Sequence, residues 1–274
     1  MYILAIETTG AYASVALARD DKIISKVEGH DRFSHLQNLA PQIRQTLRDA
    51  GLSIGDVDAI AVSQGPGSFT GIRIGVSTVR ALSQITGIPC VPVPTLQALA
   101  TRGMQTVKAG DTKASDAKAG DAKTEAVLVC PILDARRSQV YGGGYLLEDS
   151  FPVEKIKAGA YTIEEFAELI SGWDKALFIG DGADAYGEKI RQLRPAEGSD
   201  FASLYQEAEE VAHLGRKLFE SGIRLSCEEL KPEYMRLPEA ERRLREKNGQ
   251  EACGQEPITG LPEAKRRPKG RQGR

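Results

Sequence analysis

Long hydrophobic runs, clustered cysteines and paired histidines are absent from this sequence of 274 residues. The mean hydropathy is −0.31, and no run approaches the roughly eighteen apolar residues that a membrane-spanning helix needs. The first residues contain no basic segment and reach an acid at Glu7, so we expect no signal peptide, no membrane partner and a cytoplasmic protein. The four cysteines lie far apart without a Cys-x-x-Cys pair, which argues against a disulfide framework or a zinc ribbon.

The three histidines offer no recognisable metal site. His30 and His35 are five residues apart, so on a helix they would point about 140° away from one another. A zinc peptidase needs His-Glu-x-x-His, with its two ligands four residues apart. His213 stands alone, and no Gly-x-Ser-x-Gly elbow accompanies a credible set of His and Asp. We therefore expect neither a metal nor a catalytic residue, and metal analysis would test the peptidase alternative.

Charge is nearly balanced over the chain but unevenly distributed. Residues 241–274 contain ten Lys and Arg against five Asp and Glu, whereas residues 1–240 contain 26 against 33. The tail has few large apolar residues, so we expect it to be disordered. Its arginines are either solvated or contact nucleic-acid phosphates. Residues 108–123 repeat every five positions around Lys-Ala-Gly-Asp, which is typical of a low-complexity inserted loop.

The order of expected elements predicts a tandem α/β protein. Alternating and buried patterns predict strands at 2–7, 13–19, 22–28, 58–63 and 90–93, and later at 126–133, 139–146 and 176–179. Helical spacing predicts helices from Ser34 to Gly51, over 70–86, from Thr162 to Ile170 and over 203–220. Capping-box patterns begin two of them, at Ser34 and Thr162, while Pro41 should kink the first.

This βββαβαβ order resembles the ribonuclease-H-like lobe of the actin, sugar-kinase and Hsp70 superfamily. The expected division is an N-terminal lobe over 1–100, an inserted loop region over 101–125, a C-terminal lobe over 126–240 and a basic tail over 241–274. In that superfamily, the turn after the first strand holds a nucleotide phosphate. A carboxylate there can hold a metal ion through water, while backbone amides and hydroxyls can hold phosphate. The weak nucleotide-site candidates are Glu7, Thr8, Thr9, Asp134, Gly180 and Asp181.

The string Gln64-Gly65-Pro66-Gly67-Ser68-Phe69-Thr70-Gly71-Ile72-Arg73 is the most specific in the chain. It lacks the Gly-Lys-Ser/Thr ending of a catalytic phosphate loop. The helix that follows has glycines four residues apart, each costing about 1 kcal/mol relative to Ala, which suggests that another backbone approaches closely. That backbone belongs either to the same lobe or to a partner subunit. The partner-interface candidates are Leu36, Leu39, Ile43, Leu47, Gly71, Ile72, Gly75, Val76, Val79 and Leu82.

The same string resembles the TsaB (YeaZ) family. Four further strings agree: residues 3–9, Ser34-His35-Leu36 with Pro41, Leu133-Asp134-Ala135-Arg136-Arg137 with Val140-Tyr141, and Lys231-Pro232-Glu233-Tyr234-Met235-Arg236. The resemblance covers residues 1–236 apart from the inserted loop. It implies two actin-like lobes and no metal-binding histidines.

The resemblance also implies a role in tRNA modification. The chain would be a non-catalytic scaffold that binds the catalytic subunit TsaD during formation of N6-threonylcarbamoyladenosine in tRNA, and would not itself be an enzyme. It implies a TsaE-type ATPase in the assembled complex, a homodimer through the same helices when the chain is alone, and only indirect contact with tRNA. No cofactor would bind tightly, although ATP or ADP could bind in the complex.

Two other functions are also compatible with the sequence. One is an ATP-dependent phosphotransferase of the sugar-kinase type, indicated only by Glu7, Asp134 and the Gly180-Asp181-Gly182 turn. The other is a nucleic-acid-binding module that uses the basic tail. ATP hydrolysis by the isolated protein separates the kinase from the scaffold.

Overall fold

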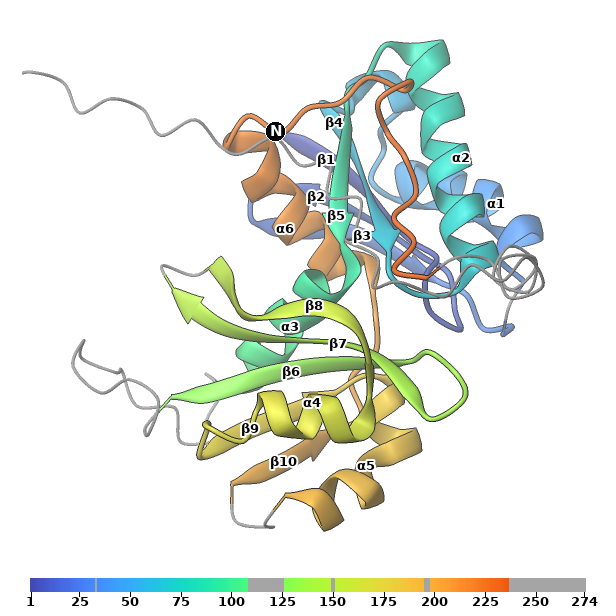
Figure 1. The fold of residues 1–274 in the computed structure, drawn as a ribbon. Coiled ribbons are helices and arrows are strands. Elements are labelled where there is room, and N and C mark those ends of the chain that lie inside the picture. The colour runs from blue at the N-terminus through green and yellow to red at the C-terminus, as the bar shows by residue number, and fades with distance from the viewer. Residues whose placement is uncertain (33, 108–125, 149–150, 195–197, 237–274) are drawn as a thin grey trace, which may run out of the picture.

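The computed structural model describes residues 1–32, 34–107, 126–148, 151–194 and 198–236 as two lobes, each built on a five-stranded sheet (Figure 1). The inserted segment predicted at 108–123 and the basic tail predicted at 241–274 lie outside the described residues. Within the described part of the chain, no helix is both long and apolar enough to cross a membrane.

The first sheet has the strand order β3-β2-β1-β4-β5. Its strands are β1 (Tyr2–Glu7), β2 (Ser14–Arg19), β3 (Lys22–Glu28), β4 (Ala59–Gly65) and β5 (Cys90–Pro94). The first three pair antiparallel, and β4 and β5 continue the sheet in parallel with β1. These five strands confirm the predicted ones within one or two residues. Ile3, Leu4 and Ile6 are fully buried because helices cover both faces of the sheet.

Two helices, α1 (His35–Asp49) and α2 (Phe69–Thr86), cover one face of this sheet, with the short 3-10 helix η1 (Ile54–Asp56) between them in sequence. Ser34 is the N-cap residue of α1, but its side chain makes no capping hydrogen bond. Helix α1 continues through the exposed Pro41 as one element of 15 residues. Ser68 caps α2 by accepting a hydrogen bond from the Gly71 N–H, and Gly87 ends the helix in the left-handed conformation with φ of 73°.

The second sheet repeats the topology of the first. Its strands are β6 (Val127–Asp134), β7 (Gln139–Glu148), β8 (Phe151–Thr162), β9 (Lys175–Ile179) and β10 (Ser199–Ala202). The order β8-β7-β6-β9-β10 again combines three antiparallel strands with two that continue in parallel. Helices α4 (Ile163–Leu169) and α5 (Asp181–Leu193) pack against this sheet, and the predicted capping box of Thr162 and Glu165 begins α4. This duplicated order confirms the two α/β lobes that the sequence predicts.

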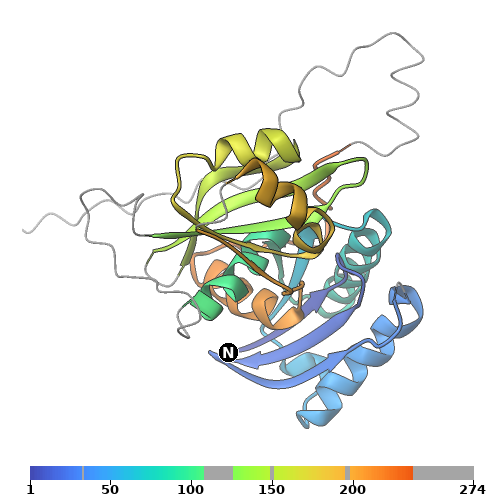
Figure 2. The ribbon, with the colours of Figure 1, turned by 90° about the horizontal axis from the view of Figure 1, so that it is seen from below.

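The two lobes exchange their last helices across the middle of the molecule (Figures 1 and 2). Helix α3 (Thr95–Thr106) belongs in sequence to the first lobe, yet Leu96, Leu99 and Met104 pack in the core of the second. Helix α6 (Ala208–Glu220) follows the second lobe and packs on the first sheet.

The predicted lobe boundaries therefore need correction. The boundary at residue 100 falls inside α3, and the lobe expected over 126–240 contains a helix that completes the other lobe's core. Small side chains let α6 approach the alanine-rich face of the first sheet closely. A Cβ added to Gly215 would lie only 2.6 Å from the Cβ of Ala61.

Candidate functional site

The first half of the candidate nucleotide site lies at the end of β1, where Glu7 is fully buried. Its Oε1 accepts hydrogen bonds from the backbone N–H and the hydroxyl of Thr9, and its Oε2 accepts one from the hydroxyl of Ser63. Burial raises the pKa of Glu7, and these hydrogen bonds oppose the rise. The carboxylate is thus bound by its own lobe instead of being presented to a metal ion or a phosphate.

The loop before α2 packs onto the residues after Glu7. The Ser68 N–H donates to the Thr9 carbonyl at 2.8 Å, and a Cβ on Gly67 would lie 2.7 Å from the same oxygen. The Thr8 hydroxyl donates to the Gly71 carbonyl at 2.8 Å. The residues that follow Glu7 are therefore held against the loop that precedes α2.

The second half of the site gathers Asp134, Gly180 and Asp181 in the other lobe. An Asp181 oxygen accepts from the Asp134 N–H at 2.9 Å, and Gly180 has a φ of 99° just before α5. Asp134 in turn accepts from the hydroxyl of Tyr186 at 2.9 Å and pairs with the guanidinium of Arg136 at 3.3 Å. Burial raises the pKa of Asp181. Among the described residues, no hydrogen bond joins this group to Glu7, Thr8 or Thr9.

The C-terminal residues 231–236, here called the strap, cross from the first lobe to the second. Glu233 donates its backbone N–H to the Gln64 carbonyl and accepts from the Gln64 side-chain amide, both at 2.8 Å. At the far end, Arg236 donates to the Ala135 carbonyl at 2.9 Å. The strap therefore ties the end of β4 to the turn that contains Asp134.

Tyr234 joins the strap to α2. Its ring lies 4.8 Å from that of Phe69 between centroids, and its hydroxyl accepts a hydrogen bond from Arg73 Nε at 2.9 Å. Arg73 also stacks over Phe69 at 4.0 Å. Sequence reasoning missed the role of Tyr234 because the motif shows only that the strap is distinctive, not which segment it contacts.

Metal-ligating side chains do not gather in the described residues. No group of three or more His, Cys, Asp or Glu is arranged there to hold a metal ion. His35 instead interacts through Nε2 with the Gly10 carbonyl at 3.0 Å, and burial lowers its pKa.

The predicted partner interface needs correction, because most of its residues face inward. Leu36 is 77% exposed and Leu82 is half-buried, whereas the other eight are buried within the first lobe. A Cβ on Gly75 would overlap the hydroxyl of Thr8, and one on Gly71 would overlap the Thr8 carbonyl. The two glycines thus let α2 approach the end of β1. A Val76→Asp or Gly75→Glu variant should therefore disturb the lobe itself.

A different set of side chains forms the outer surface of α1 and α2, here called the two-helix face. Its exposed members are Leu36, Ala40, Arg44, Arg48, Arg73, Ser77, Arg80, Ala81 and Ile85. The two helices contain four arginines and a single acid, Asp49, which accepts a hydrogen bond from Gln45. Sequence reasoning missed these arginines because it searched the helices only for apolar positions.

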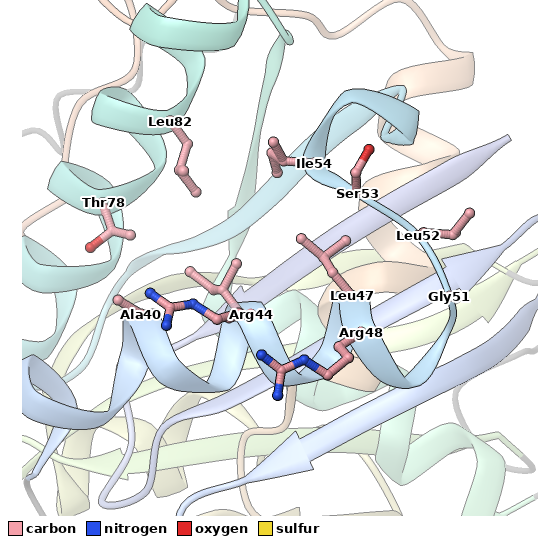
Figure 3. A pocket seen from close by; sticks show the side chains of 11 residues that line it. Ala40, Arg44, Leu47, Arg48, Gly51, Leu52, Ser53, Ile54, Thr78 and Leu82 are labelled. Carbon is pink, nitrogen blue, oxygen red and sulfur yellow. The ribbon is translucent and has the colours of Figure 1, made fainter.

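A groove of about 630 Å³ lies between α1 and α2 on this face (Figure 3). Ile43 and Leu47, which are each 7% exposed, and the half-buried Leu82 contribute apolar surface to it. Arg44 and Arg48 line it from α1, opposite Thr78 and Leu82 on α2. The groove combines an apolar lining with two guanidinium groups.

Comparisons with known proteins agree with this architecture. The family model described as TsaD, tRNA N6-adenosine threonylcarbamoyltransferase, matches residues 31–219. The chain is 28% identical over 244 residues to a Bacillus subtilis protein named tRNA threonylcarbamoyladenosine biosynthesis protein TsaB, covering 88% of this chain and 96% of that protein. It is 31% identical over 220 residues to the Buchnera aphidicola protein of the same name, covering 76% of this chain and 90% of that one.

A solved structure matches the whole fold. YeaZ from Pseudomonas aeruginosa superposes with a TM-score of 0.69 at 27% identity, over 84% of this chain and 98% of that chain. The chain belongs to the TsaB (YeaZ) family.

Proposed function

We propose that this chain is a non-catalytic subunit of the machinery that makes N6-threonylcarbamoyladenosine in tRNA, and that it acts by binding the TsaD-type catalytic subunit. Its relatives are named for that pathway, which supports the setting. The observation that carries the non-catalytic role is the state of Glu7. Its carboxylate is buried and hydrogen-bonded within its own lobe, at the turn where the fold would otherwise hold a phosphate.

The scaffold role is supported by the two-helix face. It presents exposed apolar side chains, Leu36 and Ile85, beside a groove, and such surfaces mark protein interaction sites. In this proposal the TsaD-type subunit occupies that face in the complex, and a second copy occupies it when the chain is alone. A TsaE-type ATPase joins the assembled complex, tRNA contacts are indirect, and any ATP or ADP binds only after assembly.

The test combines three measurements on purified proteins. The chain is first mixed with the TsaD protein of the same organism and analysed by size-exclusion chromatography, where we expect one joint peak. Formation of threonylcarbamoyladenosine is then assayed with all components, with and without this chain, and we expect the product only when it is present. Finally, the isolated chain is incubated with ATP and Mg²⁺. Phosphate release by the clean isolated protein would contradict the non-catalytic role and would favour the phosphotransferase alternative.

A further inference from the structure

We infer that the two-helix face recognises an acidic surface of its partner, with an apolar side chain of that partner inserted into the groove between α1 and α2, beside Arg44 and Arg48. This inference rests on the proposed function, because the partner is the TsaD-type subunit. It adds the chemistry by which the face selects that subunit over a second copy of this chain.

The first observation is a local reversal of charge. Residues 1–240 contain 26 Lys and Arg against 33 Asp and Glu, so the folded lobes lie in an acidic part of the chain. The two helices of the face contain four arginines and one acid. A positive surface on a negative body attracts a negative partner and orients its approach.

The second observation is that two of these arginines have no acidic partner of their own. Among the described residues, no carboxylate forms an ion pair with Arg44 or Arg48. By contrast, the exposed Arg136 pairs with Asp134, and Arg216 pairs with both Asp21 and Glu220. The guanidinium groups of Arg44 and Arg48 can therefore each bind a carboxylate of another molecule through charge-assisted hydrogen bonds.

The third observation is the apolar lining beside the two arginines, in the groove between α1 and α2. Arg44, Leu47 and Arg48 line the groove from α1, and Leu82 lines it from α2 (Figure 3). Apolar pockets ringed by polar groups are where binding energy concentrates in protein interfaces. The best match is thus a helix that carries one large aliphatic or aromatic side chain flanked by Asp or Glu.

A second copy of the chain is a poor match for the same reason. In a two-fold dimer the same patch lies on both sides of the interface, so the arginines of one copy approach those of the other. Like charges repel, and added salt screens the repulsion. The two kinds of complex should therefore respond to salt in opposite directions: self-association should strengthen with salt, and binding of the acidic partner should weaken.

The test measures both associations at 0.05 and 0.5 M NaCl. Titration calorimetry with the TsaD protein of the same organism gives the first affinity, and sedimentation equilibrium of this chain alone gives the second. We expect the dissociation constant for TsaD to rise about tenfold or more with salt, and that for self-association to fall. The double variant Arg44→Glu/Arg48→Glu should weaken TsaD binding by about tenfold or more at low salt. Lys157→Glu/Lys175→Glu, which reverses two exposed charges on the other lobe, is the matched control.

The possible results distinguish failure of this inference from failure of the proposed scaffold role. TsaD binding that is insensitive to salt and to the Arg44/Arg48 reversal would overturn this inference and leave the scaffold role standing. No TsaD binding at either salt concentration would overturn the scaffold role and this inference with it. Equal weakening by the Lys157/Lys175 control would show that net charge decides affinity, and it would also overturn the assignment to this groove.

Discussion

At the scale of single residues, Glu210 on α6 is a buried acid with a consequence for stability. It is 4% exposed, and one of its carboxylate oxygens has no hydrogen-bond partner among the described residues. Burial raises its pKa from 4.5 to about 7, although Arg102 opposes the rise. The folded state therefore holds a proton that the unfolded state has already released, so this group lowers the free energy of unfolding as the pH rises from about 4.5 to 7.

We predict that Glu210→Gln removes this pH dependence. A shift of this size corresponds to about 3 kcal/mol, so the variant should gain up to that amount relative to the wild type at pH 8 and little at pH 4.5. Urea unfolding at both pH values is the measurement. Glu188→Gln, at an exposed position on α5, controls for the loss of one charge. The prediction would be contradicted if the free energy of unfolding of the wild type rose between pH 4.5 and 8 and equalled that of the variant at both pH values.

Val76 and Ser77 are neighbours on α2 that face opposite ways. Val76 is 2% exposed in the core of the first lobe, whereas Ser77 is exposed on the two-helix face. We predict that Val76→Asp lowers the free energy of unfolding by about 3–5 kcal/mol, because its carboxylate would be buried without a partner. Ser77→Asp should change stability by less than about 0.5 kcal/mol.

The same pair distinguishes folding from binding. Ser77→Asp places a negative charge between Arg73 and Arg80 along the helix, so it should weaken TsaD binding while the circular dichroism spectrum and the melting temperature stay near those of the wild type. If Val76→Asp instead melts like the wild type and loses only TsaD binding, then Val76 faces the partner and its burial in the core is misassigned.

At the scale of elements, the strap is one of the features that tie the two lobes together. We predict that Tyr234→Ala loosens it, because the ring leaves Phe69 and Arg73 loses its acceptor. The expected loss is about 2 kcal/mol for a half-buried ring. Hydrogen exchange should rise in residues 64–73 and 134–137, at the two ends of the strap.

Tyr234→Phe is the matched variant, since it keeps the ring and removes only the hydroxyl. It should retain most of the protection against exchange and lose about 1 kcal/mol, the usual contribution of one hydrogen bond. If Tyr234→Ala raised exchange only at its own position, the two ends of the strap would be independent and the link between the lobes would be refuted.

Sequence periodicity predicted the elements whose residues repeat locally and missed those that depend on distant packing. The strands β1 to β7 and β9, and the ends of α2 and α4, follow from alternation, from Gly87 and from the capping box at Thr162. Strand β8 was missed because exposed Glu154, Lys155 and Lys157 interrupt its alternation. Helix α5 begins at Asp181-Gly182, which by itself favours a turn, and it forms because its buried residues pack on the second sheet.

The sequence predicted that α1 and α2 form the candidate interface, but not which of their residues are exposed. Spacing showed that α1 and α2 are amphipathic, but it could not show which stripe faces the sheet. The apolar residues and Gly71 and Gly75 turn inward, because only glycine lets α2 reach Thr8. Arg44 and Arg48 are four residues apart and so lie on the same side of a helix. This spacing could have identified the outer face of α1 from the sequence.

At the scale of the whole molecule, the exchanged helices make each lobe depend on the other half of the chain. A fragment of residues 1–107 contains all five strands of the first sheet but lacks α6. We predict that it is a loosely packed state with exposed apolar surface, because Ile3, Val91 and Val93 lose the helix that covers them. Binding of the dye ANS and the spread of amide signals in an NMR spectrum are the measurements.

Joining residues 203–236 to this fragment through a Gly/Ser linker should restore a folded lobe, since α6 and the strap then return to the first sheet. Narrow, well-dispersed NMR signals from the fragment alone would show that the first lobe folds without α6, contrary to the prediction. Failure of the joined polypeptide to fold would show that the second lobe is also required.

The exchange of helices also sets an order of events during protein synthesis. Ribosomes add about 5–20 residues per second, so α6 follows residue 107 after about 5–20 s, the time needed to translate residues 108–207. Throughout that interval the nascent chain has an uncovered apolar sheet face, which is the kind of surface that general chaperones bind. Slow codons between positions 108 and 207 would therefore lengthen the period of greatest aggregation risk.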